Sequence, residues 1–413
     1  MNRSRIARYI TEALALLRQR RFGVLRDKAQ RLLSARRSRA TMAELETACA
    51  SAGPLVCVVD GAQGGGAAVA AAQSAEAWRT RGYGTLCVNW DPLGRLTVSV
   101  QSPQQGSGSK TILAGRVSSW PSMPDSLERV EIHSLAGFTQ PDQLVEWLQR
   151  SICGSASREV NAVLYWHDHY LICPTRHLLT PVNDYCGVPD TKECAECLPH
   201  NANCLDAPLR AIDMEAWRAQ WGQLLAHVSR ICVFSPSSGE LVRRCWPDYA
   251  SKVDLAPHDV SRIPLQPIAI AADEPLNIGV IGRIGLHKGA DRVSALGRYL
   301  MEHDVPARIT VIGSLDAHVP AKVVSETGMY SPADLPALCR AHGVNVFWLP
   351  SIWPETFSFV LHEMRAMGLP ILAYDVGAQA DTLRREGGEC LLPLSASPED
   401  VLAALQDLKE HAA

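Results

Sequence analysis

Two glutamates, Glu355 and Glu363, lie on either side of a predicted turn from a strand into a helix. The apolar run 344–350 predicts the strand, and apolar residues at helical spacing predict a helix over residues 357–367. Unpaired amides at a helix N-terminus favour an anion, and here they belong to Phe357, Ser358 and Phe359. A carboxylate, an anion site and a second carboxylate suit the hexose hydroxyls, the diphosphate and the ribose of a nucleotide-sugar. Taken alone, the spacing also fits two solvated glutamates beside an ordinary helix.

A second candidate is the glycine-flanked loop 282–289, which carries Arg283 and Lys288. Two cations five residues apart, just ahead of a predicted helix, suit a diphosphate because both can face its charges. The loop lacks the spacing and the Lys-Ser/Thr ending of a P-loop. A plain surface turn is the alternative for this loop by itself.

Apolar strands alternate with helices along most of the chain, which predicts an α/β protein with parallel sheets covered on both faces. The predicted strands of the first half are 54–60, 85–90, 95–100, 129–133, 162–166, 230–234 and 252–256. Ligands of such sheets bind at the carboxyl ends of the strands. We expect that edge to carry residues 64–66, including Gly65 and Gly66, the pair His167 and Asp168, and residues 235–238.

A second alternating series follows the proline- and alanine-rich stretch 261–273. Its predicted strands are 276–281, 307–312, 344–349 and 370–374, and its predicted helices are 288–303, 332–342, 357–367 and 398–410. We therefore divide the chain into a basic helical extension (1–48) and two Rossmann-like doubly wound domains (49–265 and 266–413). Two such domains predict an active site in the cleft where they face each other.

The composition fits a globular protein of 413 residues, of which 47% are hydrophobic. No apolar run approaches the roughly 18 residues of a membrane span, and the N-terminus has no apolar signal core, so the cytoplasm is the expected compartment. Residues 1–40 hold twelve Arg or Lys against only Glu12 and Asp27. This segment fits a solvated amphipathic helix or a helix on an anionic membrane surface. We expect no nucleic-acid partner, because no recognised binding module accompanies the charge.

Five of the thirteen cysteines fall in a predicted Cys-rich loop, 173–204, and four of them are candidate zinc ligands: Cys173, Cys186, Cys194 and Cys197. The Cys-Ala-Glu-Cys pair has the spacing of a zinc knuckle, and four thiolates suit a tetrahedral structural zinc. Reduced thiols that simply pack, and a disulfide, are the alternatives.

Three groups of residues resemble the retaining group-1 (family-4-type) glycosyltransferases of the GT-B fold. They are Gly282-Arg283 with Lys288-Gly289, then residues 349–360 with Glu363, then residues 366–377. The first half resembles the same family more loosely, through residues 64–66, His167-Asp168 and residues 235–237. Residues 167–174 (His-Asp-His-Tyr-Leu-Ile-Cys-Pro) are most similar to bacterial polysaccharide and O-antigen members.

The resemblance implies a role for each residue. Arg283 and Lys288 would contact the donor diphosphate and stabilise the leaving nucleotide. The amides of residues 357–359 would bind the phosphates, although Ser358 stands where the family usually has glycine. The remaining roles are sugar hydroxyls for Glu355, ribose hydroxyls for Glu363, close backbone approach for Gly65 and Gly66, sugar or acceptor for His167, and either orientation of His167 or acceptance of the acceptor proton for Asp168.

We therefore expect a retaining hexosyltransferase that uses a GDP- or UDP-sugar and a glycan acceptor, lipid-linked in many members of the family, in bacterial surface polysaccharide synthesis. The resemblance implies front-face substitution, in which the leaving phosphate takes the acceptor proton and no protein nucleophile is needed. No Asp-x-Asp occurs, so we expect metal-independent transfer with no catalytic cofactor. A nucleotide-sugar epimerase on the same fold, or a non-catalytic glycan- or nucleotide-binding subunit, is the alternative.

If residues 1–40 hold the protein on an anionic membrane, their deletion will weaken binding to vesicles that contain anionic lipid, since each basic residue near such a surface contributes about 1 kcal/mol. Co-sedimentation with anionic and with neutral liposomes measures this. Binding that stays unchanged after the deletion would remove the hypothesis.

Overall fold

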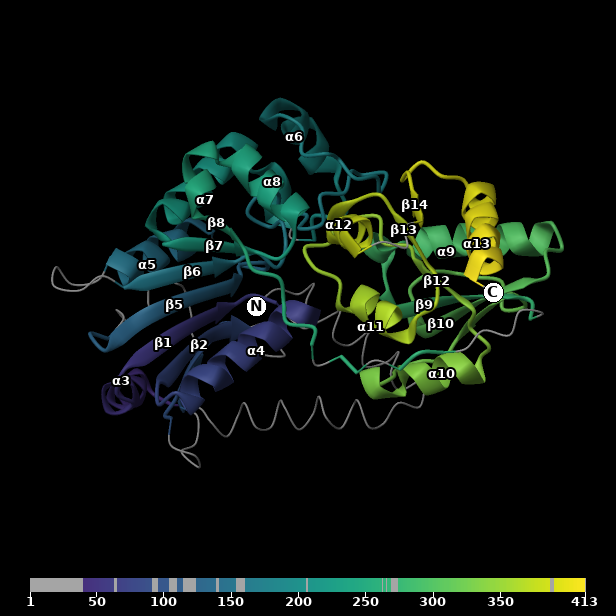
Figure 1. The fold of residues 1–413 in the computed structure, drawn as a ribbon. Helices are drawn as coiled ribbons and strands as arrows, with labels where there is room; N and C mark the ends of the chain where they lie inside the picture. Colours follow the sequence, from purple (N-terminus) through teal and green to yellow (C-terminus); the bar gives the residue numbers. More distant parts are fainter. Residues whose placement is uncertain are drawn as a thin grey trace. The chain divides into compact units, whose positions relative to one another are not determined.

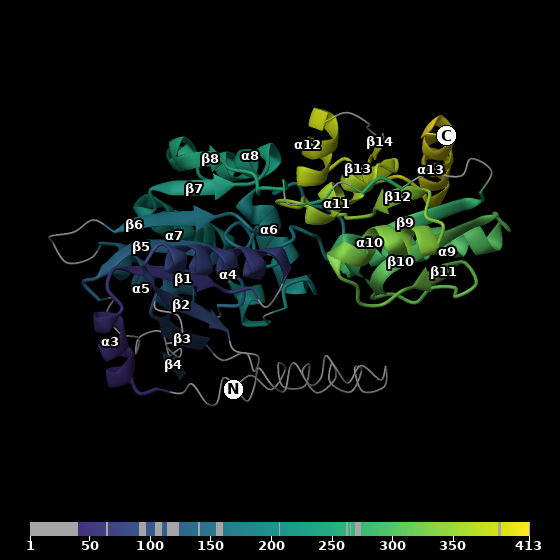
Figure 2. The same ribbon diagram turned by 60° about the horizontal axis from the view of Figure 1, so that its bottom comes forward.

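A computed structural model describes residues 40–62, 65–90, 96–103, 110–113, 124–138, 141–153, 160–205, 207–261, 263–264, 266–268, 274–386 and 390–412. The basic segment 1–39 and Gly64 lie outside these residues, and so does the predicted membrane contact. The described residues form two α/β units, each built on its own sheet (Figure 1; Figure 2). None of its helices combines the length and the apolar character that crossing a bilayer requires.

The first sheet has the strand order β4-β3-β2-β1-β5-β6-β7-β8. Its strands are β1 (Leu55–Asp60), β2 (Gly84–Trp90), β3 (Leu96–Gln101), β4 (Lys110–Leu113), β5 (Leu127–Ser134), β6 (Asn161–Tyr165), β7 (Arg230–Val233) and β8 (Val253–Leu255). β2, β1, β5, β6 and β7 pair in parallel as predicted, whereas β3 and β4 form an antiparallel edge. The reason is the short link from β2 to β3, because a parallel crossover needs about a dozen residues or more.

The second sheet has the order β11-β10-β9-β12-β13-β14, and all its strands are parallel. Its strands are β9 (Leu276–Ile284), β10 (Ala307–Leu315), β11 (Val324–Glu326), β12 (Val346–Leu349), β13 (Ile371–Tyr374) and β14 (Cys390–Leu392). Alternate residues of one strand enter opposite cores: Val346 and Trp348 pack in one cluster, Phe347 and Leu349 in the other. Both faces of this sheet are therefore buried, as the continuous apolar runs predict.

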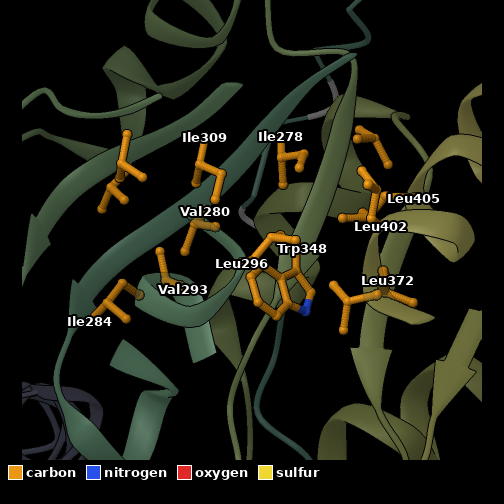
Figure 3. Packing of buried hydrophobic residues seen from close by; sticks show 14 of the residues in the cluster. Ile278, Val280, Ile284, Val293, Leu296, Ile309, Trp348, Leu372, Leu402 and Leu405 are labelled. Atoms are coloured by element: carbon orange, nitrogen blue, oxygen red, sulfur yellow. The ribbon is translucent and has the colours of Figure 1, made fainter. Parts of the chain in front are cut away.

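The helices of the described residues are α3 (Met42–Ser51), α4 (Gly65–Thr80), α5 (Pro141–Cys153), α6 (Thr191–Cys197), α7 (Met214–His227), α8 (Pro236–Cys245), α9 (Ala290–Glu302), α10 (Leu335–Ala341), α11 (Phe359–Met367), α12 (Gly377–Glu386) and α13 (Pro398–Ala412). α9 and α13 cover one face of the second sheet, with Leu296 and Leu402 buried against Trp348 and Leu372 (Figure 3). α10, α11 and α12 supply the other core through Leu335, Met364 and Leu383. The strand ends of this sheet are thereby held on a rigid support.

The chain forms two compact units. The first contains the described residues within Met1–Pro174, Asp206–Cys232 and Trp246–Asp254, and the second contains Thr175–Leu205, Val233–Cys245 and the chain from Leu255 onward. Leu179 shows why the segment Thr175–Leu205 joins the second unit, since its side chain is 2% exposed within the core of the second sheet. This grouping places the loop after Pro174 beside elements far away in the sequence.

Candidate functional site

The loop after β9 in the second unit carries both predicted phosphate-binding cations. Arg283 is exposed at the carboxyl end of the strand, and Lys288 ends the short 3₁₀ helix Leu286–Lys288. Gly289 follows with φ 80°, and a Cβ on it would lie 2.0 Å from the carbonyl oxygen of Pro350. Only glycine permits both the backbone conformation and the close approach. The loop therefore packs directly on the turn that follows β12.

That turn holds Glu355 in a buried position. Glu355 is 3% exposed, its Oε1 accepts a hydrogen bond of 2.8 Å from the Ser351 hydroxyl, and the same oxygen lies 3.9 Å from Lys288 Nζ. The turn is also fixed from the other side, because the Ala378 amide donates to the Glu355 carbonyl (2.8 Å) and a Cβ on Gly377 would lie 2.5 Å from the Cα of Pro354. A buried carboxylate beside a lysine is thus brought to the strand ends.

The helix N-terminus that follows is capped by Ser358. Its hydroxyl accepts from the Leu361 amide at 3.4 Å, so the serine that replaces the family's usual glycine has an ordinary N-cap role. Phe357 and Phe359 flank it, and their ring centroids lie 5.0 and 5.1 Å from the ring of His258. The first backbone amides of α11 therefore lie beside an aromatic cluster formed by Phe357, Phe359 and His258. Phe359 is 37% exposed.

Glu363, on the second turn of α11, is half-buried. Burial raises the pKa of Glu363 to about 6, and the positive charge of Lys288 acts in the opposite direction. Tyr330 lies near the same carboxylate, since burial and then the charge of Glu363 raise the pKa of its phenol to about 12. The structure thus brings Lys288, Glu355 and Glu363 together in one unit, and Arg283 joins them through the loop of Lys288.

His287 and its neighbours form a part of this site that sequence reasoning missed. Burial lowers the pKa of His287 to about 4, and the positive charges of Lys288, Arg176 and Arg283 lower it further. The ring of His177 stacks on His287 with centroids 4.1 Å apart and an interplanar angle of 6°. Arg176 has φ 67°, a conformation that non-glycine residues rarely adopt. No local pattern pointed to Arg176, because the contact joins segments about 110 residues apart.

The first unit carries the other predicted residues. Gly65 and Gly66 open α4, and Gly65 has φ 78° with nothing within 4 Å of where a Cβ would stand. His167 and Asp168 follow β6, and both are partly exposed. Asp168 Oδ2 accepts from the Ser134 hydroxyl and Oδ1 accepts from the Tyr170 amide, each at 2.9 Å. These two bonds fix Asp168 as part of the turn after the strand.

Asp60, Glu131 and His133 are buried groups at this edge that sequence reasoning did not single out. Burial raises the pKa of Asp60 to about 6, with the Ala62 amide and His133 acting to lower it and Asp168 to raise it. His133 Nδ1 lies 3.1 Å from His167 Nε2. The available signal was the alternation of Glu131 and His133 along β5, which puts both on one face of the sheet.

The four cysteines of the predicted zinc site are all partly exposed. Cys186 is in an environment where burial raises the pKa of its thiol, and nearby Cys194 and Cys197 raise it further. Over the described part of the chain, no disulfide forms and no three His, Cys, Asp or Glu side chains gather as a metal site would require. The zinc site, which includes Cys173, stays a prediction of the sequence.

Comparisons with known proteins give a family match for part of the chain and similar folds for most of it. Residues 275–411, which include Arg283, Lys288, Glu355 and Glu363, match the family model described as glycosyl transferases group 1. No curated protein sequence matches the chain. The fold is similar to that of HepE from Anabaena in complex with UDP (12% identity, 87% of this chain and 93% of that chain, TM-score 0.52) and with UDP-glucose (13%, 87% and 93%, TM-score 0.50). The apo lipopolysaccharide outer core galactosyltransferase WaaB follows with 11% identity, coverage of 87% and 90%, and a TM-score of 0.49.

The fold and the family match together indicate a glycosyltransferase with the GT-B fold. The match covers the second sheet and its helices. It does not include the first sheet, for which the similarity is one of fold alone.

Substituting Gly289 by alanine will destabilise the protein more than the matched change Gly343→Ala. Both positions have positive φ (80° and 64°), so both variants carry backbone strain of about 1–2 kcal/mol. Only Gly289→Ala adds a clash with a backbone carbonyl, whereas the nearest atom at Gly343 is a side-chain nitrogen at 3.8 Å. Crowding of this kind adds about 1–3 kcal/mol. Urea unfolding followed by tryptophan fluorescence measures the difference, and equal losses would contradict the tight packing.

Proposed function

We propose that the protein is a retaining, metal-independent hexosyltransferase that uses a UDP- or GDP-sugar as donor and a glycan as acceptor. Synthesis of a bacterial surface polysaccharide is the proposed setting, with residues 1–40 holding the enzyme at the inner face of the membrane near a lipid-linked acceptor. The observation that carries the proposal is the contact of Lys288 Nζ with the buried Glu355 carboxylate at 3.9 Å, beside the N-terminus of α11.

Positive charge around the loop of Lys288 supports its role as a diphosphate site. Arg176, Arg283 and Lys288 all lie close enough to His287 to lower its pKa, so three cations surround one imidazole that is neutral at pH 7. A neutral ring keeps the loop packed without adding a fourth buried charge. Fixed cations stabilise the negative charge that develops on a leaving nucleotide, which is the charge neutralisation that a metal ion supplies in other enzymes.

The proposed step balances without a protein nucleophile. The bond between the anomeric carbon and the donor phosphate oxygen breaks, and the acceptor oxygen forms its bond on the same face of the sugar. The acceptor proton passes to the leaving phosphate. Glu355 holds the sugar hydroxyls and Glu363 accepts hydrogen bonds from the ribose, while Lys288, placed near both carboxylates, contacts the diphosphate that joins the two sugars.

A uridine donor is the first to test. The similar HepE structures contain UDP and UDP-glucose. The pairing of Glu363 with nearby Tyr330 suits a nucleoside, since a carboxylate can accept from ribose hydroxyls and a phenol ring offers a flat face to a base.

Lys288→Gln will lower the rate of sugar transfer about 100- to 1,000-fold, the usual cost of one lost electrostatic contact to a developing charge. The matched control is Lys322→Gln, which removes the same charge from an exposed residue just before β11, at the amino end of the sheet and away from the site. Release of UDP from UDP-glucose, with and without a glycan acceptor, gives the rate.

Two further readouts of the same assay decide the finer points. The product's anomeric configuration, read by proton NMR, should match that of the donor, and activity should persist in EDTA. Equal rates for Lys288→Gln and wild type would refute the site. An inverted anomer, or loss of activity in EDTA that Mg²⁺ or Mn²⁺ restores, would refute the retaining or the metal-independent mechanism respectively.

Donor binding will weaken as the pH falls through about 6. Burial raises the pKa of Glu363 to about 6, so below that pH its carboxyl is protonated in the unliganded protein and no longer accepts from both ribose hydroxyls. The Kd for UDP-glucose should rise by up to about tenfold per pH unit below 6. Calorimetry from pH 5 to 8 tests this, and Glu363→Gln should bind weakly with no such pH dependence. A variant that keeps the wild-type pH dependence would assign the titration to another group.

A further inference from the structure

Buried polar side chains of β5, Glu131 and His133, form a row of contacts that ends at His167. Glu131 is 1% exposed and His133 is 3% exposed, and they occupy alternate positions of the strand. His133 Nδ1 lies 3.1 Å from His167 Nε2, and the two ring planes differ by 20°. At that distance one nitrogen must donate a proton and the other must accept it. The site residue His167 is therefore coupled to the buried ring of His133.

Glu131, which lies at the end of this row of side chains away from His167, is held as an ionised carboxylate. Its Oε1 accepts from Arg129 Nε at 2.7 Å and from the Tyr165 hydroxyl at 3.3 Å, and its Oε2 accepts from the Ser74 hydroxyl. Burial acts to raise the pKa of Glu131, but the contacts with His133, Ser74 and Arg129 outweigh it and the pKa falls to about 2. The negative charge is thus fixed at neutral pH.

The remaining nitrogen of His133 faces this charge. His133 Nε2 is buried without a hydrogen-bond partner among the described residues, and Glu131 Oε2 lies 3.7 Å from it. A lone pair on His133 Nε2 would face the negative carboxylate of Glu131 and be repelled by it. A hydrogen on Nε2 is attracted to that carboxylate and is therefore favoured. Arg129 already neutralises Glu131, so a second buried cation on His133 would gain little and lose its hydration. A neutral His133 therefore carries its hydrogen on Nε2 and its lone pair on Nδ1.

We propose that Glu131 and His133 are positioning residues that fix the tautomer of His167. Because His133 Nδ1 is then the acceptor, His167 Nε2 must carry the hydrogen, and His167 Nδ1 keeps its lone pair. His167 is thereby set to accept a hydrogen bond from a hydroxyl of the sugar or the acceptor at Nδ1. This inference rests on the proposed function for its catalytic consequence and on geometry alone for the tautomer.

Neighbouring groups define the conditions for a test. Tyr165 stacks on the His133 ring with centroids 4.6 Å apart, which holds its plane. Asp60 is an acidic group that interacts electrostatically with both His133 and Asp168, and burial raises its pKa to about 6. At pH 7.5 Asp60 is ionised, as Glu131 is, so a measurement there avoids its titration.

The tautomer can be read directly. Long-range proton–nitrogen NMR of full-length protein labelled with ¹⁵N-histidine separates the two neutral tautomers and the imidazolium by their nitrogen shifts. His133→Asn and His167→Asn assign the two rings among the 13 histidines. At pH 7.5 we expect hydrogen on Nε2 and none on Nδ1 in both rings of the wild-type protein.

Glu131→Gln should reverse the donor and acceptor roles along the contacts from residue 131 to His167, while the same side chains stay in contact. Arg129 Nε and the Tyr165 hydroxyl both donate to the Oε1 position, so the amide oxygen of the glutamine belongs there and its NH₂ group takes the Oε2 position. That NH₂ would donate to His133 Nε2, which moves the hydrogen of His133 to Nδ1 and makes His167 Nε2 an acceptor. His167 would then carry its hydrogen on Nδ1. We expect kcat to fall about 10- to 100-fold, as for loss of a group that orients a ligand-binding histidine.

Ser74→Ala is the matched control. It removes a hydrogen bond to the same carboxylate but leaves the charge that faces His133, so a purely structural role of Glu131 would be weakened in both variants. The tautomer of His167 should stay on Nε2 in Ser74→Ala and switch only in Glu131→Gln.

The outcomes separate the two proposals. Hydrogen on His167 Nδ1 in the wild-type protein, an imidazolium at His133, or a tautomer that Glu131→Gln leaves unchanged would each overturn the inference. If Glu131→Gln does not fold, the wild-type spectrum still decides the tautomer. The expected spectra together with an unchanged kcat in Glu131→Gln would support the tautomer and refute the role of His167 in transfer. The Lys288 assay tests the donor site independently of both.

Discussion

The close approach of Gly289 to the carbonyl of Pro350 is the constraint on which the donor site depends. It locks the loop after β9 to the turn after β12, and the parallel pairing of these two strands brings their carboxyl ends to one edge. Lys288 and Glu355 meet only because both segments are held there. Gly377 fixes the opposite side of the same turn by its approach to Pro354. Two glycines, each excluding a side chain for a steric reason, thus position one ion pair.

Burial decides which charges at this site are permanent and which can titrate near neutral pH. Burial raises the pKa of Glu363 to about 6, although the positive charge of Lys288 acts in the opposite direction. His287 shows the opposite response, because burial and three nearby cations keep it neutral. The first unit repeats the contrast with Glu131, whose pKa falls to about 2, and Asp60, whose pKa rises to about 6. The difference between the pKa values of Glu131 and Asp60 follows from the number of donors that reach each carboxylate.

Local pattern predicted the elements that carry the donor site. The continuous apolar runs at β9, β10, β12 and β13 predicted buried parallel strands, and each is found within a few residues of its expected bounds. Two kinds of feature were not predicted from the local pattern. The short edge strands β4, β11 and β14 have too few residues for a pattern, and the antiparallel turn of β3 onto β2 depends on the length of a link rather than on periodicity.

The sequence by itself determined the strands and helices of two α/β units and predicted that Arg283, Lys288, Glu355 and Glu363 follow strands of the second unit. Apolar runs, turn glycines and helix spacing are properties of neighbouring residues. Only the tertiary structure decided that Arg176 and His177 join His287, and that Glu131 acts on His167 through His133. These contacts join strands and loops separated by tens of residues or more, and their energies depend on burial and on distance. Neither quantity can be read from the local order of side chains, so the charge states and the tautomer in each unit are set only when its sheet forms.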